Sequence, residues 1–223
     1  MMRAVYVYII AYLVLLMVVI GMMSVYTKPE LHMMLNSCHS GFQDVFFRYY
    51  SFLAEGPLYV LALIPLLWKK VRLTVFFAIC ELTGGALLQI MKHIISFDRP
   101  VSVFENYPDQ VLPLVEGVTM HHSNSFPSGH ASTFFMFCTC VVIIHAYYYT
   151  RDNKTHSLRE RLLFHASSLL LLVAAALGAY SRVYLSQHFL SDVCVGSMIG
   201  FTIPFLMFYL LKGWILKKEN EEK

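Results

Sequence analysis

Six apolar segments, each long enough to cross a bilayer, constrain the fold of this chain more than any other feature. A helix needs about 20 residues to cross about 30 Å of hydrocarbon. The segments occupy residues 5–23, 52–68, 73–91, 131–149, 162–180 and 189–211. Only 14% of the 223 residues are charged, whereas soluble domains carry about 25%. We therefore expect an all-α polytopic membrane protein with six transmembrane helices.

The first apolar segment is expected to stay in the mature protein. It follows a single basic residue, Arg3, and its long apolar run has no small-residue cleavage site, unlike a removed signal peptide. The chain shows no internal repeat and no low-complexity stretch. We interpret residues 1–223 as a single integral-membrane domain.

The basic residues between the segments predict the orientation of the chain. Most of the 17 Lys and Arg residues precede the first segment, follow the sixth, or lie in the second and fourth connections. The positive-inside rule places these regions, and both termini, in the cytoplasm. The other connections, which hold Lys28, Arg48, Lys92, Arg99 and Arg182, are then expected on the outer face.

Residues 26–50 join the first two segments on the predicted outer face. They mix apolar and polar side chains and include Phe46, Phe47, Tyr49 and Tyr50. Such a composition is typical of a helix that lies along the membrane surface. We predict an interfacial helix that would admit a lipid chain sideways.

Charge and cysteine content give little support to nucleic-acid, disulfide or metal chemistry. The net charge of +3 is too small to indicate a nucleic-acid partner. The five cysteines match neither a disulfide framework nor a zinc-site spacing. Adjacent His121 and His122 are interpreted as solvated loop residues. None of these residues predicts a metal site or a cofactor.

Three polar stretches, all on the predicted outer face, carry the residues suited to chemistry. The first leaves the third segment and holds Lys92 and Arg99; the third enters the sixth segment and holds Arg182. Three cations, two with guanidinium forks, suit the oxygens of a tetrahedral oxyanion. These residues predict a phosphate site.

The second stretch, Pro127-Ser128-Gly129-His130, enters the fourth segment. Amides at the start of a helix attract an anion, Ser128 adds a hydroxyl, and Gly129 lets the backbone approach closely. His130 and His188 would divide the work of nucleophile and proton donor. Asp192 lies four residues after His188, so on a helix it would share one face with this histidine and orient it.

Taken together, these stretches resemble a known family signature. The combination of Lys92-x6-Arg99-Pro100, Pro127-Ser128-Gly129-His130 and Ser181-Arg182-x5-His188-x3-Asp192 resembles that of the type 2 phosphatidic acid phosphatase superfamily. The motifs match in order and in internal spacing across residues 92–192.

The resemblance implies a metal-independent phosphatase that works through a phosphohistidine. His188 would attack phosphorus, Asp192 would orient it, and His130 would protonate the leaving oxygen and then activate water. The phosphoryl oxygens would be held by Lys92, Arg99, Ser128, Gly129 and Arg182.

The expected function is therefore an integral-membrane lipid phosphatase of a bacterial cytoplasmic membrane, acting on the periplasmic face. Its partners would be the bilayer and a lipid phosphate. We favour a cell-envelope lipid, undecaprenyl pyrophosphate or a lipid A phosphate, because such lipids present phosphate on the outer face. Phosphatidylglycerol phosphate and phosphatidic acid are the alternatives.

Glu81 is an acidic residue near the middle of the third apolar segment, and it has a structural and a functional interpretation. We expect it to bond a neighbouring helix, with Gly84 and Gly85 allowing close approach. The alternative is a midplane ion site of a transporter, which is disfavoured because the charged groups cluster at one interface. A haloperoxidase-like enzyme is disfavoured by the six predicted spans.

Overall fold

The computed structural model describes residues 4–60, 63–64, 70–151 and 155–215. In this part of the chain every regular element is a helix, which confirms the all-α prediction. In chain order they are α1 (Tyr6–Val25), α2 (Lys28–Leu35), α3 (Gly41–Phe52), the 3₁₀ helix η1 (Leu53–Glu55), α5 (Val71–Ile94), α6 (Pro100–Phe104), α7 (Gly129–Thr150), α8 (Leu158–Tyr184) and α9 (Leu190–Ile215).

Among the described residues, five helices are long and apolar enough to cross a membrane: α1, α5, α7, α8 and α9. They overlap the first, third, fourth, fifth and sixth predicted segments. The second predicted segment, 52–68, includes residues 61–62 and 65–69, which lie outside the described residues. The count of six spans therefore stays a prediction.

Polar capping extends the spanning helices beyond their apolar runs, as α8 shows. Ser157 and Glu160 form a capping box, in which the Ser157 amide donates to Glu160 Oε2 at 2.7 Å and the Glu160 amide donates to Ser157 Oγ at 3.3 Å. α8 consequently starts four residues before its predicted segment, with charged residues in its first turn.

The central helix of the bundle is α7. In its most apolar stretch 67% of the residues are buried inside the molecule, against 11% for α1. One apolar cluster joins α7 to α1, α8 and α9, and a second joins it to α5 and α9. α1 therefore lies at the periphery and presents most of its apolar surface outward.

α7 and α9 pack with their backbones in direct contact, because two glycines of α9 face α7. Gly196 leaves no room for a β-carbon against the Ser128 carbonyl oxygen, and Gly200 leaves none against the Ser132 carbonyl oxygen. Small residues four apart let membrane helices approach closely. This contact fixes the starts of α7 and α9 relative to each other.

Glu81 bonds neighbouring elements, as predicted. Its carboxylate accepts from the Tyr59 hydroxyl, and its Oε1 accepts from Thr133 Oγ1 of α7 at 3.3 Å. Gly84 packs against the side chain of Met136, whereas Gly85 faces open space. These contacts give Glu81 a place in helix packing, and they weaken the transporter alternative.

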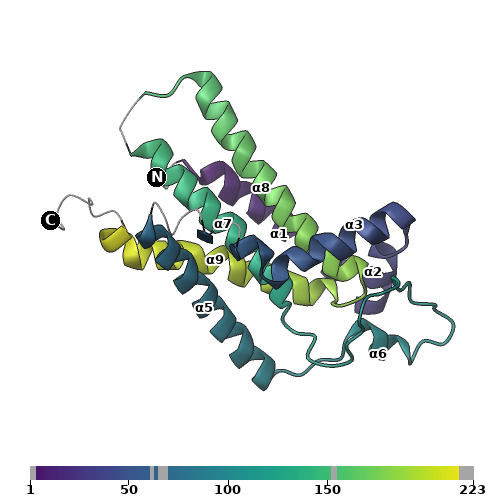
Figure 1. The fold of residues 1–223 in the computed structure, drawn as a ribbon. Coiled ribbons are helices and arrows are strands. Elements are labelled where there is room, and N and C mark those ends of the chain that lie inside the picture. The colour runs from purple at the N-terminus through teal and green to yellow at the C-terminus, as the bar shows by residue number, and fades with distance from the viewer. Residues whose placement is uncertain (1–3, 61–62, 65–69, 152–154, 216–223) are drawn as a thin grey trace.

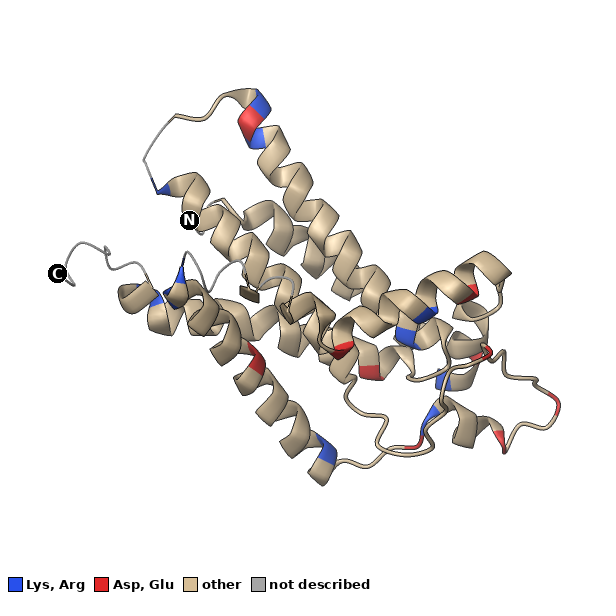
Figure 2. Cartoon of the chain, viewed as in Figure 1, with Lys and Arg blue, Asp and Glu red and all other residues tan. Residues whose placement is uncertain are grey.

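The short helices gather at one end of the bundle, opposite the start of α1 and the end of α9 (Figure 1). There α2, α3, α6 and the loop that precedes α7 lie over the ends of the long helices. Charged residues concentrate at the two ends of the bundle and are sparse along the long helices between them (Figure 2). This distribution suits a bundle whose middle lies in hydrocarbon.

The prediction of one interfacial helix over residues 26–50 was wrong in one respect, because the segment forms two helices. α2 begins at a capping box made by Thr27 and Glu30. α3 begins at Ser40, whose hydroxyl accepts from the Gln43 amide at 3.3 Å. Between the two helices, Asn36 ends α2 and Ser40 caps α3.

Candidate active site

The three predicted polar stretches meet at the end of the bundle that carries α2, α3 and α6. The Ser125 amide donates to the carbonyl of Phe97 at 2.9 Å, which joins the first stretch to the second. The Ser128 amide donates to the carbonyl of Asp192 at 3.0 Å, which joins the second to the third. Arg99 Nη1 donates to the carbonyl of Gln187 at 3.1 Å and closes the set.

His188 and Asp192 form a buried pair, with Nδ1 and Oδ2 3.7 Å apart. The expectation that both lie on one helix was wrong, because α9 begins at Leu190 and His188 belongs to the turn before it. Asp192 Oδ2 also accepts from Ser125 Oγ at 2.5 Å and from the Phe189 amide at 3.1 Å. These bonds lock the carboxylate beside the imidazole.

Burial keeps the His188 imidazole neutral. The side chain is almost fully enclosed, and this desolvation lowers its pKa to about 4, despite the opposing effect of Asp192. The charges of Arg99 and Arg182 lower the pKa further. A neutral imidazole with Nδ1 toward a carboxylate leaves Nε2 as the nitrogen able to attack.

Ser128 caps α7 and presents the first turn of this helix to the site. Its hydroxyl accepts from the Ala131 amide at 3.5 Å. The amides of Gly129 and His130 precede the helical ladder, as first-turn amides do, so the helix itself supplies no acceptor for them. The start of α7 can therefore receive an anion.

Lys92, Arg99 and Arg182 lie close enough for their positive charges to act on one another and on His130. Burial lowers the pKa of Arg99, and Asp192 opposes this effect. Arg99 Nε donates to the Ser123 carbonyl at 2.9 Å. Arg99 thus holds the loop before α7 and also contributes charge.

Arg182 has an unmet hydrogen-bonding capacity. Its Nη1 donates to Ser51 Oγ of α3 at 2.5 Å. Its Nε is buried and has no hydrogen-bond partner among the described residues. A buried guanidinium N–H without an acceptor is costly, so an anion bound here would satisfy it.

A polar pocket of about 460 Å³ opens beside these groups. His130 and Arg182 line it, whereas His188 is 2% exposed and is not among its lining residues. The other lining residues come from α3, η1 and the turns near 117–121 and 185–187: Arg48, Tyr49, Ser51, Phe52, Glu55, Gly117, Val118, Thr119, His121, Leu185 and Gln187.

Sequence reasoning missed Ser51, Glu55 and Gln187. Gln187 contacts Arg99 through its Oε1 at 3.2 Å, and Ser51 contacts Arg182. Ser51 and Glu55 lie outside the three motifs, at the edge of an apolar segment. The only hint of them in the sequence was that two polar residues stand four positions apart at the edge of this apolar segment.

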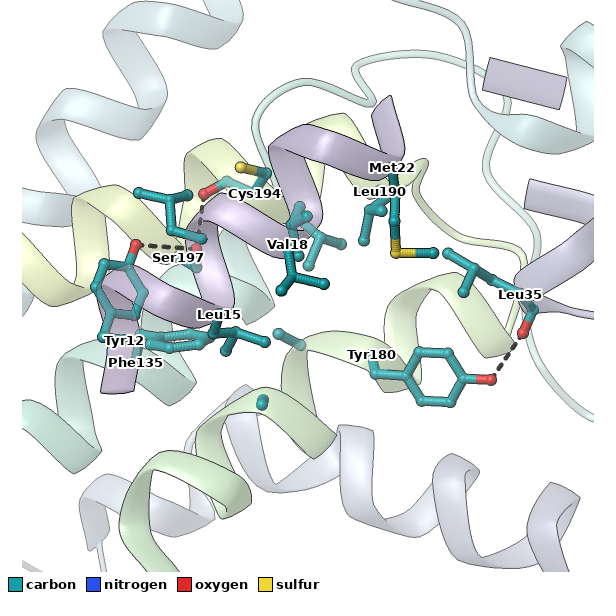
Figure 3. A pocket seen from close by; sticks show the side chains of 15 residues that line it. Tyr12, Leu15, Val18, Met22, Leu35, Phe135, Tyr180, Leu190, Cys194 and Ser197 are labelled. Carbon is teal, nitrogen blue, oxygen red and sulfur yellow. Dashed lines mark hydrogen bonds between the residues drawn. The ribbon is translucent and has the colours of Figure 1, made fainter. Parts of the chain in front are cut away.

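A second, apolar pocket of about 250 Å³ lies between α1, α7, α8 and α9 (Figure 3). A hydrogen bond from Tyr180 to the Leu35 carbonyl lies at one end, and the Tyr12–Ser197 hydroxyl pair lies at the other. None of the predicted site residues lines it. Two of the predicted site residues, His130 and Arg182, instead line the polar pocket.

Within the described residues, no three His, Cys, Asp or Glu side chains are grouped so that they could hold a metal ion. His122 instead contacts Ser102 Oγ at 3.0 Å through Nδ1.

Comparison with known proteins places the site in a family context. The family model described as the PAP2 superfamily matches residues 71–215, which include all three motifs. Phosphatidylglycerophosphatase B of Bacillus subtilis (strain 168) is 30% identical over 133 residues. The alignment covers 59% of this chain and 59% of that relative.

Two solved structures share the fold. LpxE of Aquifex aeolicus gives a TM-score of 0.63 at 22% identity, covering 82% of this chain and 96% of that one. The first transmembrane PAP2-type phosphatidylglycerolphosphate phosphatase from Bacillus subtilis gives 0.56 at 16% identity, covering 96% of each chain.

Proposed function

The chain belongs to the PAP2 superfamily, and we propose that it is an integral-membrane lipid phosphatase that acts through a phosphohistidine. One observation carries the proposal: Arg182, whose buried Nε has no partner among the described residues, lies close enough for its charge to act on His130 and on His188 of the buried His188–Asp192 pair. This is an anion site with a nucleophile and a proton donor beside it.

In the proposed first half-reaction, His188 Nε2 attacks phosphorus while Asp192 holds the Nδ1 proton. The P–N bond forms as the bond from phosphorus to the leaving oxygen breaks. His130 gives a proton to that oxygen. In the second half-reaction, His130 takes a proton from water, the resulting hydroxide attacks phosphorus, and His188 is released.

The negative charge of the phosphoryl oxygens must be balanced in both steps. We assign this role to the cations Lys92, Arg99 and Arg182, and to Ser128 with the Gly129 amide at the start of α7. These groups provide the charge that a metal ion supplies in other phosphatases. We therefore propose that no metal is needed.

The lipid part of the substrate would lie along α3. An apolar groove on α3, lined by Phe42, Val45, Phe46, Tyr49, Tyr50 and Leu53, shares Tyr49 with the polar pocket. A phosphate in the polar pocket would then leave its chains in this groove. This supports a membrane lipid over a soluble phosphate ester.

Among lipid phosphates, we place phosphatidylglycerol phosphate first, since the name of the Bacillus subtilis relative includes that activity. Undecaprenyl pyrophosphate, a lipid A phosphate and phosphatidic acid present the same phosphoryl group. If both termini are cytoplasmic, the site would lie on the periplasmic side of a bacterial inner membrane.

The test is phosphate release by the purified protein from these four lipids, with excess chelator present. His188→Ala, His130→Ala and Asp192→Asn should each lose most of the activity. Full activity of His188→Ala would refute the phosphohistidine. Activity that the chelator abolishes would refute metal independence, and no release from any lipid would refute the phosphatase itself.

A further inference from the structure

A short segment outside the three motifs touches two of the proposed active-site residues. Ser51 lies near the end of α3, and its hydroxyl accepts a hydrogen bond from Arg182. Glu55 is the last residue of η1, and its Oε1 lies 3.4 Å from His130 Nε2. η1 follows α3 without a gap, so Ser51 and Glu55 project from nearly the same side.

The surroundings of His130 make this carboxylate consequential. Burial disfavours a protonated His130 most, and the positive charges of Arg182, Arg99 and Lys92 add to this effect. A proton donor must carry its proton before the reaction. The carboxylate of Glu55, which also acts on Arg182, is the anion nearest to the His130 ring among the described contacts.

We propose that Glu55 is a positioning residue for His130, in the way that Asp192 is for His188. Glu55 accepts a hydrogen bond from Nε2–H, turns Nδ1 toward the leaving oxygen and offsets part of the surrounding positive charge, which favours the protonated ring that donates. Nδ1 then gives its proton to the leaving oxygen and regains one from water, while Glu55 stays ionised throughout. This inference rests on the proposed function.

The geometry favours this role over that of a structural ion pair. The side chain of Glu55 is 52% exposed and lines the polar pocket, where substrate has access. An exposed ion pair of this kind contributes little to stability. Its contact with His130 is also long enough to tighten when substrate arrives.

The test compares Glu55→Gln with wild type on two soluble substrates, an alkyl phosphate and p-nitrophenyl phosphate. The alkoxide of the first needs a proton to leave, whereas nitrophenolate leaves without one. We expect Glu55→Gln to lower kcat/KM for the alkyl phosphate about 100-fold, within the usual range for general acid catalysis. The kcat/KM for p-nitrophenyl phosphate, which reports only the steps up to loss of the leaving group, should stay near the wild-type value and also show that the variant is folded.

Two further variants sharpen the comparison. Glu55→Asp keeps the carboxylate and should recover much of the alkyl phosphate activity. Glu105→Gln is the matched control, because Glu105 is also an exposed carboxylate facing a histidine, His122, at 4.0 Å, but it does not line the pocket. It should act as wild type on both substrates.

Equal losses on both substrates in Glu55→Gln, or no loss on the alkyl phosphate, would overturn the inference. A loss in Glu55→Asp as large as in Glu55→Gln would overturn it as well. A wild-type protein that hydrolyses neither these phosphates nor the lipids fails at the proposed function, which is a distinct result.

Discussion

Gly196 of α9 lies directly against the carbonyl oxygen of Ser128, the residue that caps α7. The Ser128 amide also donates a hydrogen bond to the carbonyl of Asp192 at 3.0 Å. The proposed phosphate-binding start of α7 is therefore placed against the proposed orienting carboxylate by backbone contacts. Helix packing and active-site geometry are coupled at this point.

Replacement of Gly196 or of Gly200 should disturb both the packing of α9 on α7 and the geometry of the proposed active site. Gly196→Ala and Gly200→Ala would push α9 away from the α7 backbone, and overpacking of this kind costs about 1–3 kcal/mol. We expect a lower melting temperature in detergent and a loss of phosphatase activity. Gly213→Ala in the same helix is the control, since its β-carbon would meet no atom within 4 Å. Similar behaviour of all three variants would contradict the prediction.

Asp192→Asn should reduce kcat far more than substrate binding. An amide cannot hold His188 in the tautomer that leaves Nε2 free, and a comparable change in a serine protease costs about 10⁴-fold. Asp192 raises the pKa of His188, so its loss lowers that pKa further. Steady-state kinetics against pH should show a smaller kcat, with the acidic limb at lower pH. An unchanged kcat would refute the orienting role.

Two buried histidines make stability depend on pH. Burial lowers the pKa of His32 and of His188 to about 4 each, with Asp192 opposing in both cases. An unfolded histidine titrates near about 6.5, so between about pH 6.5 and 4 the unfolded chain binds more protons than the folded one. Stability should therefore fall as pH drops through this window.

Thermal unfolding in detergent at pH 7.5 and at pH 5 measures this effect. His32→Phe removes one of the two titrations, so the difference between the two melting temperatures should become smaller. An equal difference in wild type and His32→Phe would show that His32 does not contribute.

Arg182→Lys should weaken phosphate binding although the charge is kept. Lysine lacks the Nε–H that stands unpartnered in Arg182 and cannot present a guanidinium fork. Charge-assisted hydrogen bonds contribute about 1.5–3 kcal/mol, so the inhibition constant of inorganic phosphate should rise about 10- to 100-fold. Arg159→Lys should change it little, because Arg159 is exposed in the first turn of α8, at the other end of the helix from Arg182. Equal constants for wild type and Arg182→Lys would contradict the assignment.

Much of this architecture was predictable from the sequence because lipid imposes simple rules. Spanning helices need continuous apolar runs, and five of the six predicted segments coincide with described helices. The motif residues also meet, since three polar stretches at one end of a helical bundle have little room to separate. The catalytic roles within that cluster remain predictions.

Contacts that depend on how elements dock were not predictable. Ser51 and Glu55 reach Arg182 and His130 because α3 packs on α8 and η1 packs on α7. The Gly196–Gly200 spacing is visible in the sequence, but it does not identify α7 as the partner. The break between α2 and α3 depends on individual capping residues, which are hard to recognise in a segment of mixed polar and apolar residues.

The aromatic face of α3 leads to the last prediction, which concerns the lipid chain. Phe42 is 80% exposed and Tyr49 is 66% exposed, and both line the apolar groove that shares Tyr49 with the polar pocket. Phe42→Ser with Tyr49→Ser should raise KM for a long-chain lipid phosphate about tenfold, because about 1–2 kcal/mol of apolar contact is lost. Hydrolysis of a short soluble phosphate should not change. Tyr209→Ser is the matched control, since Tyr209 is also 66% exposed but lies near the C-terminal end of α9. Equal losses on both substrates would show that α3 does not hold the chain.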